Sequence, residues 1–309
     1  FYLGSSGDVT FNSSLAITNS SSANNSQVYL NNSTSSNNFY NENITIAVTD
    51  ANADGIYFGA SGGTGVLAAT RTISIGAGGY IAGDLFLRNF TQIGATSQTL
   101  SLTGTANTTM YSSNWGGNLT LASPQVTTRE TIYNGVTSIT KTSSGNDYSY
   151  GSNTFNQNVT FNHNGLDIMR LSNNLPDDFN GNVIYTTSST GSLQPAYNGI
   201  STYAQNITFN TVSSITLGLS TGTVEMNGTN AQNINRVGAT AIPTFRRLRL
   251  NNASNEITLN TPITGSVQLE FIQGNLVSTP TNFMTLGDNV SAIGASNNSY
   301  VYGPIEKIG

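Results

Sequence analysis

The chain has 309 residues, of which 8% are charged, and a formal net charge of −5 at pH 7. Its ten basic residues are scattered, which argues against nucleic acid or an anionic membrane surface as a partner. No run of about 18 apolar residues is present, so no membrane insertion is expected. The lack of cysteine excludes disulfides and thiolate metal sites and is compatible with an extracellular location.

Short runs that alternate apolar and polar residues occur along the chain, and no stretch has a convincing helical pattern. In chain order they include residues 9–11, 44–46, 85–87, 119–121, 215–217 and 257–259. This period of two is typical of a strand with one buried face. Asn-Gly pairs between such runs predict turns, because both residues tolerate positive φ. Aromatic and β-branched residues at strand spacing favour an ordered chain over a disordered one.

Three copies of one strand follow each other in the centre of the chain at steps of 24 residues. They begin FNQNVTF at Phe155, FNGNVIY at Phe179 and YAQNITF at Tyr203. A repeat of this length that cannot bury its own apolar face predicts a solenoid, in which equivalent positions stack. We therefore expect two aromatic stacks and one asparagine ladder. Their members are Phe155, Phe179 and Tyr203; Phe161, Tyr185 and Phe209; and Asn158, Asn182 and Asn206.

These patterns predict an all-β, right-handed parallel β-helix (β-solenoid), with tandem β-sandwich modules as the alternative. The solenoid is favoured because sandwich strands rarely repeat side chain for side chain. We expect irregular coils over residues 1–130, regular 24-residue coils over 131–220 and further coils over 221–309. Outside the regular stretch, Asp8, Asn43, Asp84 and Asn118 precede comparable strands at longer intervals. Those intervals predict longer coils or pairs of short ones.

Residues able to support catalysis are few, and no catalytic, cofactor or metal residue is assigned. His163 is the only histidine and is expected in a surface turn, within NHNGL, rather than in a catalytic triad. Asp177 and Asp178 could join Asp167 in a calcium site, although adjacent acids in a turn are more often solvated.

Three further features have competing interpretations. Two acid–base pairs could resemble the paired acids of a glycosidase: Arg129 with Glu130, and Asp167 with Arg170. The interpretation as ion pairs at strand edges is favoured. Trp115 could stack on a sugar. It stands three residues before Asn118, as Phe155 stands before Asn158, so a core position is favoured.

Residues 222–309 carry a recognisable pattern. It runs from GTVEMNGTNAQNI through FRRLRLNNASNEITLN to SYVYGPIEKIG. This pattern resembles large, repetitive surface proteins of Bacteroidota bacteria, including gliding adhesins exported by the type IX secretion system. Arg246, Arg247 and Arg249 replace mostly neutral residues of that pattern, and no C-terminal sorting domain is recognised.

The resemblance implies a non-catalytic segment of a secreted adhesin on the bacterial cell surface, acting as an adhesive or spacer stalk. Expected partners are the rest of a larger parent chain, type IX secretion or gliding components, and a surface glycan or protein ligand. The alternatives are a polysaccharide-degrading β-helix enzyme and a carbohydrate-binding module. Acids clustered in a groove would favour the enzyme, and an exposed aromatic platform would favour the binding module.

Overall fold

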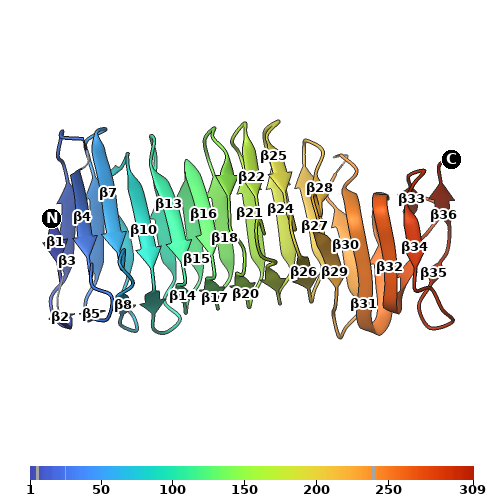
Figure 1. Cartoon of the computed structure of the whole chain (residues 1–309), viewed down its shortest axis with the longest axis horizontal. Coiled ribbons are helices and arrows are strands. Elements are labelled where there is room, and N and C mark those ends of the chain that lie inside the picture. Colours follow the sequence, from blue (N-terminus) through green and yellow to red (C-terminus); the bar gives the residue numbers. More distant parts are fainter. Residues whose placement is uncertain (5–6, 25, 239–240) are drawn as a thin grey trace. The chain divides into compact units, whose positions relative to one another are not determined.

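The computed structural model is an all-β protein, and residues 1–4, 7–24, 26–238 and 241–309, which it describes, contain no helix. Parallel strands stack in about 12 turns and form a β-solenoid (Figure 1). The predicted solenoid is confirmed. The sandwich alternative is wrong, because sandwiches are built from antiparallel sheets whereas the sheets here are parallel. Within those ranges no helix is long and apolar enough to cross a membrane.

The chain divides into two compact units, Phe1–Asp147 and Tyr148–Gly309. The short strand β19 (Asp147–Tyr148) contains the last residue of the first unit and the first residue of the second. The division falls within the predicted stretch 131–220. The predicted three-part organisation of the coils stays a prediction.

In unit 1 each full coil contributes one strand to each of three walls. The first wall is one sheet of β1 (Tyr2–Leu3), β4 (Ser26–Leu30), β7 (Ala53–Phe58), β10 (Asp84–Arg88), β13 (Asn107–Tyr111) and β16 (Gln125–Arg129). The second contains β2 (Val9–Phe11), β5 (Asn37–Tyr40), β8 (Thr64–Leu67), β11 (Phe90–Gln92), β14 (Asn114–Trp115) and β17 (Ile132–Tyr133). The third contains β3 (Leu15–Asn19), β6 (Ile44–Val48), β9 (Ile73–Tyr80), β12 (Gln98–Ser101), β15 (Leu119–Ser123) and β18 (Thr137–Lys141).

Unit 2 begins with the same three-strand coil. One series is β20 (Thr154–Phe155), β23 (Asp178–Phe179), β26 (Ile200–Tyr203) and β29 (Thr223–Met226). The next is β21 (Val159–His163), β24 (Val183–Thr187), β27 (Ile207–Thr211) and β30 (Gln232–Arg236). The last is β22 (Ile168–Arg170), β25 (Ser192–Gln194) and β28 (Thr216–Leu217).

The end of unit 2 contains longer strands, β31 (Thr244–Leu259) and β32 (Ile263–Val277). Successive parts of β31 pair with β28, β29 and β30, so this one strand follows all three walls. Its register against β32 shifts between Phe245 and Arg247, which marks a bulge at the consecutive arginines. The short strands that follow are β33 (Met284–Leu286), β34 (Ser291–Ile293), β35 (Val301–Tyr302) and β36 (Ile305–Lys307).

The core is made of inward-facing side chains that stack from coil to coil. Phe179 lies between Phe155 and Tyr203, with ring centroids 5.2 and 4.8 Å away. Tyr185 lies in the same way between Phe161 and Phe209. Both predicted stacks are confirmed. In the outward ladder, the side-chain Nδ2 of Asn182 donates to Asn158 Oδ1 at 3.1 Å. The backbone N–H of Asn206 donates to Asn182 Oδ1 at 3.2 Å.

The sequence intervals between Asp8, Asn43, Asp84 and Asn118 do not correspond to the coils of unit 1. Asp8 contacts Asn37, 29 residues later, rather than the Asn43 position. Asp84 contacts Asn107, 23 residues later, rather than Asn118, and Asn118 itself contacts Val136, 18 residues later. The coils therefore become shorter along the unit. The intervals in the sequence connect residues that lie on different walls.

Candidate ligand-binding surface

The outer face of the first wall of unit 1 presents three columns of side chains. Side chains alternate between the two faces of a strand, so equivalent outward positions of neighbouring strands form a column with steps of about 4.8 Å. The aromatic column contains Tyr2, Tyr29, Tyr57 and Phe86, followed by Thr109 and Thr127. The amide–acid column contains Gln27, Gly55, Asp84, Asn107 and Gln125, and the arginine column contains Arg88, Tyr111 and Arg129.

The rings of Tyr2, Tyr29 and Tyr57 are stacked on one another, whereas the Phe86 ring is tilted by 41° relative to that of Tyr57. The centroid distance is 4.9 Å between Tyr2 and Tyr29, 5.1 Å between Tyr29 and Tyr57, and 5.9 Å between Tyr57 and Phe86. Burial raises the pKa of Tyr57 well above its ordinary value, and the charge of Asp84 adds to this, so the phenol stays neutral. The series of rings ends at Phe86, because the next position is Thr109.

A depression opens where the rings end. Its volume is about 140 Å³, and we call it the Thr109 depression. It is lined by Asp84, Asn107, Thr108, Thr109, Gln125, Val126, Thr127, Asn146 and Asp147. A second depression of about 200 Å³ shares Asn107 and Gln125 with it and extends toward Pro124. The Thr109 depression therefore has a threonine floor and a wall of amides and carboxylates.

The carboxylate of Asp84 is held in place by the two columns that it borders. Its Oδ1 accepts a hydrogen bond from Asn107 Nδ2 at 3.0 Å, and its Oδ2 accepts one from the Tyr57 hydroxyl at 3.3 Å. The hydroxyls of Thr109 and Thr127 lie 3.0 Å apart on the floor. These contacts pre-orient the polar groups around the depression.

Asp147 lies beneath the same depression and is 1% exposed. Its Oδ2 accepts the backbone N–H of Val126 at 2.9 Å, and the Lys141 ammonium lies 3.4 Å away. Burial raises the Asp147 pKa to about 6, although the Val126 N–H and Lys141 oppose the rise. The carboxylate thus satisfies a backbone donor of β16, and its position suits a structural role.

The arginine column lies two residues further along the same strands, beyond Phe86, Thr109 and Thr127. The guanidinium carbons of Arg88 and Arg129 lie 4.9 and 4.4 Å from the centroid of the Tyr111 ring. Arg129 also forms the predicted ion pair with Glu130, at 2.9 Å. That prediction is confirmed, and the pair offsets positive charge beside the depression.

Two of the residues singled out in the sequence are in the core. Trp115 is fully buried, so its predicted core position is confirmed. The predicted surface position of His163 is wrong, because the residue is fully buried at the end of β21. Strand alternation continues from Val159 through Phe161 to His163, and the Nε2 atom lies 2.6 Å from the Asp167 carbonyl oxygen.

Asp177 and Asp178 face opposite sides of the wall and so do not form a shared calcium site. Asp177 is buried and accepts hydrogen bonds from Asn153 and Ser172, whereas Asp178 is exposed and accepts one from Thr202 at 2.7 Å. Throughout the described ranges, no three His, Asp or Glu side chains are grouped to hold a metal ion.

Arg170 was predicted to pair with Asp167 at a strand edge. Its guanidinium donates to the side chains of Gln194 and Asn173, at 2.9 and 3.0 Å. The same group lies 3.7 Å from the centroid of the Tyr197 ring.

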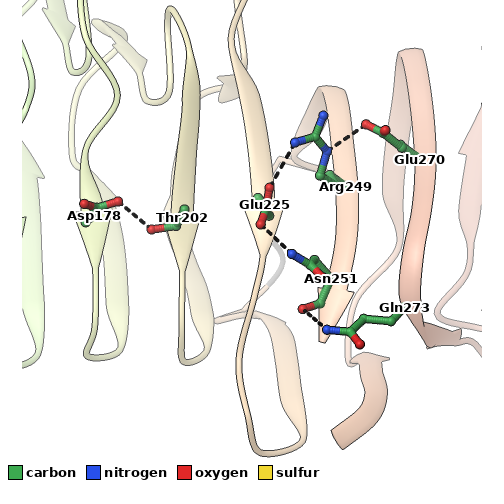
Figure 2. A network of polar contacts seen from close by, with 7 residues as sticks. All are labelled: Asp178, Thr202, Glu225, Arg249, Asn251, Glu270 and Gln273. Atoms are coloured by element: carbon green, nitrogen blue, oxygen red, sulfur yellow. Dashed lines mark hydrogen bonds and ion pairs between the residues drawn. The ribbon is translucent and has the colours of Figure 1, made fainter. Parts of the chain in front are cut away.

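A polar column also crosses the outer face of unit 2 (Figure 2). Arg249 on β31 bridges two carboxylates, with Glu225 at 3.1 Å and Glu270 at 2.7 Å. Asn251 donates to the second oxygen of Glu225 at 2.8 Å. The unusual Arg249 thus joins three neighbouring strands. Burial alone would lower its pKa, but its bonds to Glu270 and Glu225 raise the pKa overall.

Sequence reasoning missed the aromatic column. A signal exists in the triplets VYL at 28–30, IYF at 56–58 and LFL at 85–87, each with an aromatic residue between two apolar ones. The depression at the end of that column has no such signal, because it depends on which residue of the next coil follows Phe86.

Comparison of the chain with protein-family models, curated proteins and solved structures finds no match.

Proposed function

We propose that the chain is a non-catalytic adhesive segment of a secreted bacterial surface protein, with a solenoid that also acts as a spacer. The observation that supports this is the outer face of the first wall of unit 1. There a partly exposed aromatic column is followed, on the next two strands, by threonines that line a polar depression whose groups are already oriented by hydrogen bonds. A surface that is ordered before binding loses less entropy when a ligand binds.

The resemblance of residues 222–309 to Bacteroidota gliding adhesins supplies the proposed setting. In that setting the segment belongs to a longer chain, reaches the cell surface through the type IX secretion system and serves cell attachment or gliding. The low content of charged residues suits a surface module, because few groups on it titrate or are screened by salt.

The adhesive role is tested with beads that carry the full 309-residue chain. We expect these beads to remain on polysaccharide-coated surfaces under flow, whereas beads carrying an unrelated protein of similar charge detach. Equal detachment of both sets of beads on every coating would contradict adhesion.

A second candidate function is glycoside hydrolysis. Asp84 and Asp147 line one depression, and burial raises the pKa of Asp147 to about 6, as a general acid requires. Two observations weigh against it: Asp147 is 1% exposed, and its Oδ2 is engaged by the Val126 N–H.

Incubation with plant, algal and bacterial polysaccharides separates these functions. We expect no release of reducing or unsaturated ends. Release that disappears in both Asp84→Asn and Asp147→Asn would establish the hydrolase instead.

A further inference from the structure

We propose that a depression on unit 2, which we call the Tyr300 depression, binds a neutral saccharide. Its volume is about 550 Å³, and it is lined by Ile272, Gln273 and Asn275 of β32 and by residues 296–298 and Tyr300 of the following coil. This volume lies within the range of roughly 300–1,000 Å³ that ligand sites usually have. The site shares no residue with the surface of unit 1 and does not depend on the adhesive function.

The first argument is the presence of two apolar side chains that remain in contact with solvent. Ile272 is 55% exposed and Tyr300 is 38% exposed. The register between β31 and β32 shifts after Leu250, and Ile272 is the extra residue of the resulting bulge. The successive residues Ile272 and Gln273 are both exposed, so the bulge places an apolar and a polar side chain next to each other.

The second argument is that two side-chain amides are held in place at one end only. The Oδ1 atom of Asn275 accepts the backbone N–H of Tyr300 at 3.2 Å. The Nε2 group of Gln273 donates to the Asn251 carbonyl oxygen at 3.4 Å (Figure 2). Among the described residues, Asn275 Nδ2 and Gln273 Oε1 have no hydrogen-bond partner. One amide therefore offers a donor to a ligand, and the other offers an acceptor.

The third argument is the rim of the depression, which is a turn fixed to β32. The backbones of Ser296 and Ser299 exchange two hydrogen bonds, at 2.9 and 3.2 Å. The buried Ser299 hydroxyl donates to the Gly274 carbonyl oxygen at 2.7 Å. Asn297 and Asn298, at the tip of this turn, are exposed and line the depression. Because the turn is already ordered, a ligand that binds to it loses less entropy.

These groups together favour a neutral saccharide. Of the described residues that line the depression, none is Asp, Glu, Lys, Arg or His, so no charged ligand is favoured. A purely apolar ligand would leave the amides without partners, which costs free energy. A sugar ring presents C–H groups on its faces, which an aromatic ring attracts, and hydroxyls around its edge, which amides bind.

The test uses the full chain, with the neutral disaccharides cellobiose, maltose, lactose and diacetylchitobiose as probes. Saturation-transfer NMR reports which sugar protons lie against the protein. We expect at least one probe to give a signal, strongest for the ring C–H protons.

Two variants probe the site, each with a matched control. Tyr300→Ala removes the aromatic ring. Its control is Tyr302→Ala, because Tyr302 is 64% exposed and does not line the depression. Asn275→Asp keeps the acceptor for the Tyr300 N–H but replaces the free donor with a second acceptor. Its control is Asn289→Asp, which makes the same change at an exposed position outside the depression.

Both site variants should lose about tenfold in signal while the thermal midpoint is retained, and both controls should bind as the wild type does. That pattern would support the site. No signal from any probe with the wild type, wild-type signals in both site variants, or equal losses in the controls would overturn it. Bead adhesion is scored separately on the same proteins. Beads that adhere although no sugar binds would overturn the Tyr300 site and leave the adhesive function standing.

Discussion

Asp177 and Asp178 are consecutive residues with opposite environments. Asp178 begins strand β23 with its side chain directed outward, whereas the Asp177 side chain is buried. Asp177 accepts hydrogen bonds from the backbone and side-chain amides of Asn153, at 2.9 and 2.8 Å, and from the Ser172 hydroxyl at 2.6 Å. Burial nevertheless dominates these bonds and raises the Asp177 pKa from 3.8 to about 6. The folded state is therefore less stable when the Asp177 carboxyl group is ionised than when it is protonated.

This shift predicts a pH dependence of stability. The folded state holds the Asp177 proton more tightly than the unfolded state does. The contribution of Asp177 to the free energy of unfolding is therefore greatest below pH 3.8 and is lost as the pH rises through about 6. A shift of this size corresponds to about 3 kcal/mol. Asp177→Asn should therefore flatten the fall in the free energy of unfolding, measured with urea at a series of pH values.

The neighbouring substitution Asp178→Asn is the control for this prediction. Its side chain is exposed and its charge is the smallest of the causes that raise the Asp177 pKa, so it should reduce the pH dependence only slightly. An identical slope for Asp177→Asn and the wild type would show that the buried carboxylate is not responsible. Asp147 contributes a slope of the same sign, since burial also raises its pKa to about 6, so the slope should not vanish entirely.

Arg249 offers a second prediction at this scale. Arg249→Met removes the partner of Glu225 and Glu270, whose side chains are 12% and 20% exposed. Two carboxylates that are largely withdrawn from water would lose a charged donor, so we expect a loss of about 2 kcal/mol in the free energy of unfolding. In the same strand, Arg247→Met removes only a bond to the Ser220 carbonyl at an exposed site and should cost less than about 1 kcal/mol. Equal costs for the two variants would contradict the bridging role.

At the scale of the strand, stability comes from equivalent side chains stacking in register. Phe179 is 1% exposed and has a stacked ring on each side, from Phe155 and Tyr203. Strand pairing through β20, β23 and β26 places these rings directly above one another. Each coil thus supplies a surface on which the next coil packs.

Phe179→Ala should open a cavity in this stack and cost about 3–5 kcal/mol in the free energy of unfolding. Asn180→Ala removes one exposed hydrogen bond to Asn156 and should cost less than about 1 kcal/mol. The two variants are compared by urea denaturation, and the comparison is valid when the free energy of unfolding has the same dependence on urea concentration in both. Similar losses for the two variants would argue against the stack as the main source of stability in these coils.

At the scale of the whole molecule, the exterior is made of amide and hydroxyl ladders with few charges. The ion pairs that are described include partly exposed ones, such as Arg71 with Glu42, and the buried pair of Lys141 with Asp147. Exposed pairs are screened by salt, whereas side-chain amide ladders are not.

Stability should therefore depend little on ionic strength. Raising NaCl from about 0.05 M to about 1 M should change the free energy of unfolding of the full chain by less than about 1 kcal/mol. Thermal and urea unfolding across this range would measure it. A loss of several kcal/mol would mean that long-range electrostatics, rather than packing, stabilise the coils.

The sequence by itself determined the fold class and the register of the coils that contain Phe155, Phe179 and Tyr203. Near-identical strands at a constant step of 24 residues reveal which positions stack, because each copy repeats the same inward and outward residues. The position of Trp115, three residues before Asn118 as Phe155 is before Asn158, also placed it in the core. The alternation of side chains would have placed His163 in the core too, had the Asn-Gly turn beside it not suggested a surface position.

Only the tertiary structure decided the register of unit 1 and with it the candidate site. Coil lengths there change from 29 to 23 and then to 18 residues, so no constant interval connects Asp8 with Asn37 or Asp84 with Asn107. Two threonines line the Thr109 depression because the two strands after β10 carry Thr109 and Thr127 at the position that holds a ring in β10. Which residues become neighbours across a wall depends on how many residues each turn between strands absorbs. That number follows from the packing of the complete coil and not from any one strand.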